Sequence, residues 1–99
     1  MRPETRFKVR VLRELRGRGA WAFKVQLRAL RGIPDVIGCW QGYFFALELK
    51  TEDEEPDPLQ RRVMHLIRKA GGKAEIAKPS NYLKIINEWD KQIHSQLSK

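Results

Sequence analysis

The spacing of apolar residues along the chain predicts a mixed α/β fold. Over residues 4–16 they recur every three or four positions, which is typical of a helix with one buried side. Over 21–27 they alternate with other residues, which predicts a half-buried strand with Trp21 on its apolar side. Two further apolar runs, at 35–40 and 43–49, predict a β-hairpin because the two residues between them suit a tight turn.

The second half of the chain predicts two more helices around a short strand. Asp57-Pro58 suits the N-cap and first position of a helix, and Gly71-Gly72 is expected to end it. Residues 73–77 then predict a short strand, and the apolar residues over 81–97 recur with the period of a helix. The expected order of elements is therefore αβββαβα.

Length and composition favour one folded domain. Ninety-nine residues are close to the usual size of a domain, so we expect a single core over about 4–77 and a C-terminal helix over about 81–97. The sequence has no apolar stretch of membrane-spanning length and no signal-peptide core, so we expect a cytoplasmic protein without a membrane partner. Cys39 is the only cysteine, which excludes an internal disulfide, and a buried thiol is expected.

Charge is distributed unevenly around the net value of +8. Residues 1–34 carry ten Lys or Arg against two Glu, and residues 59–99 carry nine against three acids. Residues 35–58 instead carry seven acids against one Lys, with an acidic run at 52–55. A basic body around an acidic centre favours a polyanion such as DNA or RNA as partner, although ribosome-associated and membrane-surface proteins can be as basic. The acidic run leaves the path of a nucleic acid open.

The predicted hairpin brings two carboxylates face to face. If Gln41-Gly42 is a two-residue turn, Asp35 lies opposite Glu48, with Cβ atoms roughly 5 Å apart, and Lys50 lies on the same side of the strand. Facing carboxylates repel unless a cation lies between them, and Mg²⁺ takes such oxygens while keeping waters for a phosphate. The pattern thus predicts a metal site for phosphodiester hydrolysis, in which Lys50 orients or deprotonates water or holds the phosphate. The alternative is an ordinary exposed pair of Glu48 and Lys50.

Two further polar residues are candidates for this site. Glu4 lies in the middle of the apolar stripe of the first helix, where an acid pointing toward the core suggests a role, although a first-turn acid also favours the helix dipole. Gln60 could face the site, because it lies within about 60° of the centre of the apolar stripe of its helix, which is formed by Leu59, Val63, Leu66 and Ile67. Equally, Asp57 and Gln60 have the spacing of a capping box, and both interpretations stay open.

These residues resemble a known family. Gly32-Ile33-Pro34-Asp35, followed by Glu48-Leu49-Lys50 and by Gln60 at the head of a helix, closely resembles the PD-(D/E)XK nuclease superfamily. Within it the chain is most similar to the VRR-NUC type, which includes stand-alone phage and bacterial nucleases. The resemblance covers about residues 4–77. It implies a restriction-endonuclease-like αβββαβ core with a mixed central sheet, to which a C-terminal helix is added.

The resemblance also implies roles for individual residues. It assigns metal binding to Glu4, Asp35, Glu48 and the backbone carbonyl of Leu49, and it makes Lys50 the catalytic lysine. Lys24 matches a basic position often seen in such domains. The basic residues that follow it in the chain, Arg28 and Arg31, are further candidates for nucleic-acid binding.

The resemblance finally implies an activity and an assembly. It implies a Mg²⁺- or Mn²⁺-dependent endonuclease in the cytoplasm of a bacterial or phage-infected cell, acting as a homodimer on branched DNA such as Holliday junctions. The alternative is a basic nucleic-acid-binding module, or an inactive nuclease-like scaffold, in which Asp35 and Glu48 merely solvate the hairpin. A homodimer is also suggested by the final helix, whose apolar stripe could be shared with a second copy or could pack on its own sheet: Tyr82, Ile86, Trp89, Ile93 and Leu97.

Overall fold

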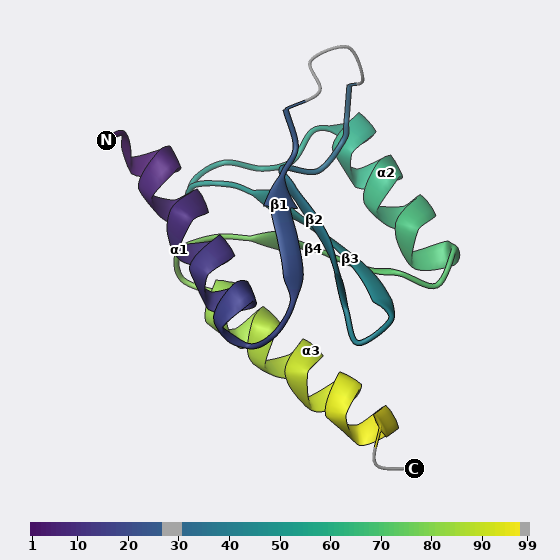
Figure 1. The fold of residues 1–99 in the computed structure, drawn as a ribbon. Coiled ribbons are helices and arrows are strands. Elements are labelled where there is room, and N and C mark those ends of the chain that lie inside the picture. The colour runs from purple at the N-terminus through teal and green to yellow at the C-terminus, as the bar shows by residue number, and fades with distance from the viewer. Residues whose placement is uncertain (27–30, 98–99) are drawn as a thin grey trace.

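A four-stranded mixed sheet lies between two layers of helices (Figure 1). The computed structural model describes residues 1–26 and 31–97. Its elements are α1 (Pro3–Gly17), β1 (Trp21–Lys24), β2 (Val36–Trp40), β3 (Tyr43–Leu49), α2 (Pro58–Lys69), β4 (Lys73–Ala77) and α3 (Tyr82–Leu97). The predicted order and the mixed sheet are confirmed. No helix in the described ranges is long and apolar enough to cross a membrane.

The strands lie in the order in which they occur along the chain. β1 pairs with β2 and β2 with β3 in antiparallel fashion, whereas β3 and β4 are parallel. Gln41 and Gly42 both have positive φ, 50° and 86°, as a two-residue turn between twisted strands requires. The register that a two-residue turn predicts is confirmed, from Trp40 paired with Tyr43 to Val36 paired with Leu47.

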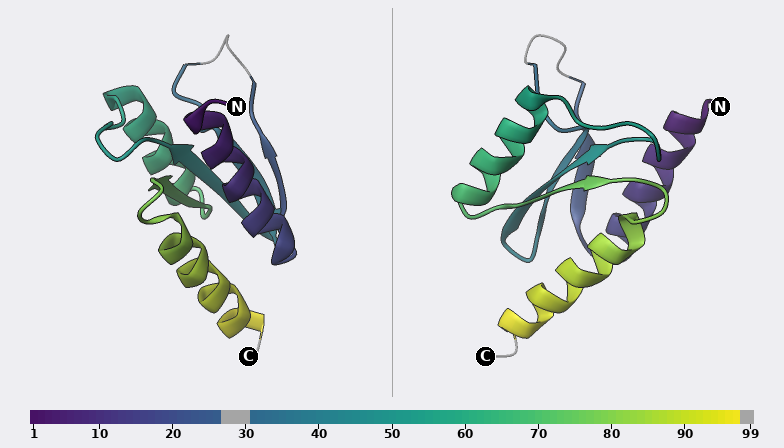
Figure 2. Two further views of the ribbon diagram at one scale, coloured as in Figure 1. Left: turned by 90° about the vertical axis from the view of Figure 1, so that its left-hand side faces the viewer. Right: turned by 180° about the vertical axis from the view of Figure 1, so that it is seen from behind.

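The larger core lies between the sheet and the pair α1 and α3. In Figure 2 the view turned by 90° shows α1 and α2 on opposite sides of the sheet. Phe7, Val11, Leu12 and Leu15 of α1 are buried, as their spacing predicts. Ile86, Trp89 and Ile93 of α3 are buried in the same cluster. These three residues of the α3 stripe are thus covered within the chain, whereas the side chain of Leu97 lies outside the described residues. Sharing of the stripe with a second copy stays a prediction.

A smaller core lies under α2 on the other face of the sheet. Met64 is its buried centre, packed with Ala46 and Ala74, and Ile67 lies against it. The predicted stripe of α2 was centred differently, because it included Leu59 and Leu66, which are 43% and 47% exposed. The helix is rotated so that its buried side runs through Gln60, Met64 and Ile67, which follow one another at helical spacing.

The β1–β2 half of this second face is left open, because α2 packs on β3 and β4. Trp21, Cys39 and Phe44 lie side by side across three strands, with Phe23 in the next row. Trp21 is 68% exposed, Phe44 45% and Phe23 38%. We call these four residues the open sheet face.

The open sheet face corrects two predictions. In β1 the small Ala22 is buried, whereas the aromatic residues on either side of it are exposed. Cys39 is exposed rather than buried, since its side of β2 has no helix over it. The strand is also shorter than predicted: it ends at Lys24, and position 27 of the predicted strand lies outside the described residues.

Candidate active site

Asp35 and Glu48 lie at the same end of the β2–β3 hairpin. The register of the hairpin, continued by one step beyond its last pair, places Asp35 opposite Glu48. Asp35 Oδ2 accepts a hydrogen bond from the backbone N–H of Leu49 at 2.8 Å. The carbonyl oxygen of Asp35 accepts another from the N–H of Val25, also at 2.8 Å. The first bond holds the Asp35 carboxylate beside Glu48, and the second holds the backbone of Asp35.

Glu48 is a buried acid. Only 3% of it is exposed; its Oε1 atom accepts a hydrogen bond from Gln60 Nε2 at 3.1 Å and lies 4.0 Å from Lys50 Nζ. Its Oε2 atom is buried and has no hydrogen-bond partner among the described residues. Burial, followed by the neighbouring Asp35 carboxyl group, raises the pKa of Glu48 to about 8, and the Lys50 ammonium offsets this only in part.

This arrangement is short of positive charge and fits a divalent cation. Mg²⁺ and Mn²⁺ take carboxylate oxygens, and either ion would give Glu48 Oε2 a partner and keep the carboxylate ionised. Asp35 and Glu48 would hold the ion, and the backbone carbonyl of Leu49 is a further donor of the right kind. Within residues 1–26 and 31–97, no group of three or more His, Cys, Asp or Glu side chains is placed to hold a metal. Water and substrate phosphate would therefore complete the coordination.

Gln60 combines the two roles that its sequence position suggests. Its Oε1 atom accepts a hydrogen bond from the N–H of Asp57 at 3.0 Å, and its own N–H donates to Asp57 Oδ1 at 2.9 Å, which completes a capping box. Its Nε2 atom remains free to donate to Glu48 Oε1 at 3.1 Å. The two interpretations are compatible because an amide has both an acceptor and a donor end.

A hollow of about 230 Å³ opens between α1 and the end of the hairpin. Glu4, Lys8 and Arg10 line it from α1, and Asp35 and Lys50 line it from the hairpin side. Glu4 is exposed, so the prediction that it points toward the core is wrong. The reason is that α1 begins at residue 3, which leaves the side chains of its first turn at the rim of the packed sheet. Glu4 nevertheless shares the hollow with Asp35.

Sequence reasoning missed Lys8 and Arg10 as neighbours of the site. A signal for Lys8 was available, because it follows Glu4 by four residues and so lies on the same side of the helix. Arg10 carries no such signal. Its place at the hollow depends on how α1 crosses the end of the sheet.

Among known proteins, similarity to this chain was found by structure and not by sequence. No protein-family model matches this chain, and no curated protein matches it. A solved structure described as a VRR_NUC domain superposes on it with a TM-score of 0.72 and 24% sequence identity, covering 85% of this chain and 94% of that chain. The chain has the fold of a VRR-NUC domain. The architecture that the resemblance implies is thereby confirmed.

In this VRR-NUC fold the glycine of the G-x-P-D segment lies in close contact with α2. Gly32 has φ of +82°, and a Cβ atom on it would lie 2.8 Å from Leu59 Cγ and 3.1 Å from the Leu59 carbonyl oxygen. A side chain here would push against the first turn of α2, which carries Gln60. Gly32 therefore lets the segment before Asp35 and the head of α2 come close together.

The acidic run 52–55 of this VRR-NUC fold forms hydrogen bonds and a salt bridge with the segment that follows β4. Glu52 accepts hydrogen bonds from the backbone N–H and the hydroxyl of Ser80, both at 2.7 Å. Lys78 Nζ donates to the carbonyl oxygen of Glu52 at 3.1 Å and forms a salt bridge with Glu55 at 3.4 Å. Much of the acidity of this loop therefore fastens it to the turn between β4 and α3.

Two of the three basic residues proposed for nucleic-acid binding are described. Lys24 pairs with Val36, the residue after Asp35, and its side chain is exposed. Arg31 is exposed in the loop that leads to Asp35. Neither is among the residues that line the site hollow. Arg28 lies outside the described residues.

Proposed function

We propose that this protein is a metal-dependent endonuclease that hydrolyses phosphodiester bonds in DNA. The observation that carries the proposal is the facing pair Asp35 and Glu48, in which a buried carboxylate oxygen lacks a partner among the described residues. Lys50 lies 4.0 Å from the other oxygen of Glu48. The fold of a VRR-NUC domain, a family named for nucleases, supports the same function.

Each residue of the site has a role in this proposal. Asp35, Glu48 and the Leu49 carbonyl would hold Mg²⁺ or Mn²⁺, and Glu4, which lines the same hollow as Asp35, would contact a water bound to the ion. The ion supplies charge stabilisation at the phosphate and a lowered pKa of water. Lys50 orients or deprotonates the attacking water, or holds an oxygen of the scissile phosphate. Gln60 keeps Glu48 Oε1 in place through the hydrogen bond at 3.1 Å.

DNA is the proposed substrate, in a branched or otherwise structured form such as a Holliday junction. The net charge of +8 supports a polyanion as partner. The branched form rests on the resemblance to stand-alone VRR-NUC nucleases. We further propose that residues 1–99 act as one nuclease domain.

A homodimer also forms part of the proposal, although its surface differs from the one first suggested by α3. The open sheet face carries three aromatic side chains that are exposed in the single chain. A twofold contact through this face would cover them and place two sites on one assembly, as paired incisions across a junction require.

The test is a cleavage assay on a panel of junction, flap, splayed and linear DNAs. Purified protein is incubated with each DNA and Mg²⁺ or Mn²⁺, and the Asp35→Asn variant serves as control for contaminating nuclease. We expect metal-dependent cleavage that the variant lacks, with structured DNA preferred. Binding of DNA without cleavage under any metal would contradict the proposal and indicate a binding module instead.

A further inference from the structure

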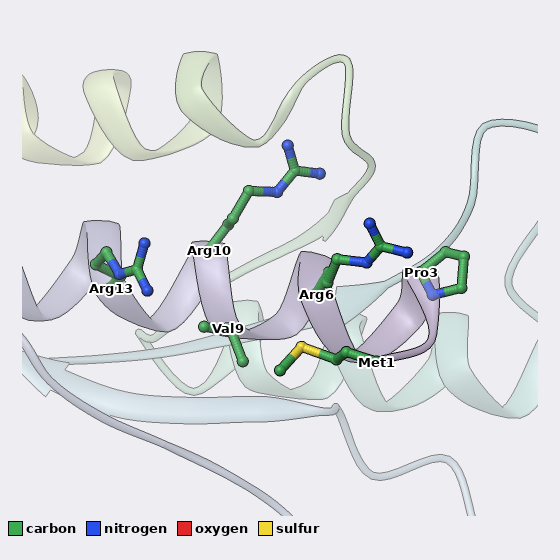
Figure 3. A pocket seen from close by; sticks show the side chains of 6 residues that line it. All are labelled: Met1, Pro3, Arg6, Val9, Arg10 and Arg13. Carbon is green, nitrogen blue, oxygen red and sulfur yellow. The ribbon is translucent and has the colours of Figure 1, made fainter.

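Three arginines form a row along α1. Arg6, Arg10 and Arg13 are spaced by four and three residues, so they lie within about 60° of one another around the helix, and all three are exposed. Together with Met1, Pro3 and Val9 they line a hollow of about 660 Å³ (Figure 3). In this view Arg6 and Arg10 reach out from the same side of the helix. We call Arg6, Arg10 and Arg13 the α1 arginine row.

The row differs from the next two arginines along the chain, each of which has a partner within the fold. Arg16 donates to the carbonyl oxygen of Ala22 at 2.8 Å, and Arg18 pairs with Glu14 and Asp90 at 2.8 and 3.2 Å. Those arginines support the fold. Within the described ranges no salt bridge or hydrogen bond joins Arg6, Arg10 or Arg13 to an acid. Glu14, which lines a hollow with Arg10 and Arg13, forms its salt bridge with Arg18 instead.

Arg10 is nevertheless held in place. Its guanidinium carbon lies 5.8 Å from the ring centre of Phe7 and 6.0 Å from that of Tyr82. Contacts of this kind orient a guanidinium without neutralising it. Arg10 is therefore a fixed positive charge in the middle of the row.

The row continues directly from the proposed active site. Arg10 and Pro3 line both the hollow of the row and the hollow that holds Asp35 and Lys50. From Arg6 to Arg13 the helix rises by about 10 Å. Measured along the axis of a DNA duplex, three nucleotide steps of one strand, with a rise of about 3.4 Å each, cover the same length.

The chemistry that matches such a row is a run of phosphates. Exposed arginines in series, without salt bridges within the described ranges, release the counterions of a polyanion that binds them, and each guanidinium can bind two phosphate oxygens. The acidic loop on the other side of the site hollow, where Glu54 lines it, disfavours a strand leaving in that direction. A strand leaving over α1 meets positive charge instead.

We propose that the α1 arginine row is a phosphate-binding track that holds the substrate strand adjacent to the scissile bond; the identity of this strand as substrate rests on the function proposed above. The track sets the direction in which the strand leaves the site. It also contributes affinity without taking part in the chemistry.

The test compares two variants that each lose two positive charges. The first is Arg6→Gln with Arg13→Gln, which spares Arg10 because of its contacts with aromatic rings. The control is Lys69→Gln with Lys91→Gln, two exposed lysines on α2 and α3. Binding to fluorescent junction DNA is measured with a chelator present, over a series of salt concentrations, so that it is independent of cleavage. Circular dichroism melts verify that both proteins are folded.

For the arginine variant we expect about tenfold weaker binding, and a slope of log affinity against log salt that is smaller by about 2. In the lysine control, the loss of affinity and the decrease in slope should each be less than half of these values. Arg6→Lys with Arg13→Lys should keep the slope, because each ammonium still neutralises a phosphate. Single-turnover cleavage by the saturated complex of the lysine control should be unchanged.

If the arginine variant and the control have equal affinity for DNA and equal salt slopes, the proposed track is contradicted, even if the wild type cleaves DNA. Binding to anionic lipid vesicles with no binding to DNA would overturn it as well. If the arginine variant has a smaller salt slope but the wild type cleaves no DNA, the phosphate-binding track is supported and the proposed nuclease activity is contradicted. The two proposals therefore fail separately.

Discussion

Gln60 Nε2 donates a hydrogen bond to Glu48 Oε1 at 3.1 Å, so the residue that closes the cap of α2 also contacts the buried acid of the site. The start of a helix and the orientation of a proposed metal ligand thus depend on one amide. Loss of this amide should affect both stability and metal binding.

Two variants separate these effects. Gln60→Ala and Asp57→Ala both remove part of the capping box and should each cost about 1 kcal/mol of stability. Only Gln60→Ala also removes the hydrogen bond to Glu48, and we expect it alone to weaken metal binding, by about 10- to 100-fold. Urea denaturation measures the first effect and calorimetric Mn²⁺ titration the second. Equal metal affinity in the two variants would show that the contact with Glu48 has no bearing on the metal.

The facing carboxylates predict separable losses of cleavage and binding. Asp35→Asn and Glu48→Gln each remove a proposed metal ligand but keep the volume of the side chain. We expect cleavage with Mg²⁺ to fall by at least about 100-fold in each, while the fold and most of the DNA affinity remain. Gel-based cleavage and anisotropy on the same DNA measure the two quantities. Turnover near that of the wild type in either variant would show that the site is elsewhere.

Lys50 should act on the chemical step. Its ammonium lies beside Glu48 and lines the site hollow. Lys50→Ala is therefore expected to lower kcat by about 100-fold or more with little change in DNA affinity. Lys78→Ala removes a nearby ammonium that binds the acidic loop and is a matched control. If Lys50→Ala instead weakens binding and leaves single-turnover cleavage of the bound fraction unchanged, Lys50 is only a phosphate anchor.

The raised pKa of Glu48 predicts a pH dependence of stability in the metal-free protein. The unfolded chain loses this proton near pH 4.5, whereas the folded chain keeps it until about pH 8. The contribution of protonated Glu48 to the free energy of unfolding is thus fully present below pH 4.5. It is lost as the pH rises toward 8, and the loss is on the order of a few kcal/mol.

Glu48→Gln has no proton to lose at this position and is the reference for that measurement. With a chelator present, the difference in the free energy of unfolding between Glu48→Gln and the wild type should grow from pH 4.5 to 8 and then level off. Added Mg²⁺ at pH 8 should stabilise the wild type and not the variant. A difference independent of pH would mean that Glu48 is ionised in the folded, metal-free chain.

The open sheet face predicts how the proposed dimer can be disrupted. Trp21→Ser combined with Phe44→Ser should convert a dimer into a single chain of 11.6 kDa without loss of fold, because both side chains are exposed. Leu83→Ser removes an exposed apolar side chain of α3, 43% exposed, and should leave the dimer intact. Sedimentation equilibrium measures the masses. A wild type of 11.6 kDa, with or without DNA, would exclude the dimer.

The hairpin could be predicted from the sequence because its register depends on a local rule. A two-residue turn at Gln41-Gly42 determines every pair between β2 and β3, and so brings Asp35 opposite Glu48. The elements themselves follow from periodicity and from helix-capping residues such as Asp57. These features depend on neighbours in the chain.

Features that depend on packing between distant elements could not be predicted in this way. The burial of Ala22 rather than Trp21 depends on which half of the sheet α2 covers. The rotation of α2 onto Met64 depends on the small side chains of β3 and β4 beneath it. The exposure of Glu4 depends on how far α1 extends past the sheet. Periodicity shows which side of a helix or strand is apolar, but it does not show how much of that side another element covers.

The parallel pairing of β3 with β4 has a consequence for the order in which the site assembles during folding. The two carboxylates come from one hairpin, whose ends meet over a short loop at small entropic cost, so their juxtaposition can form early. The backbone N–H of Lys50, in contrast, donates to the carbonyl oxygen of Ala77 at 3.0 Å, beyond the whole of α2. That bond forms only when β4 docks, so we expect the acids to meet before the backbone of Lys50 is fixed.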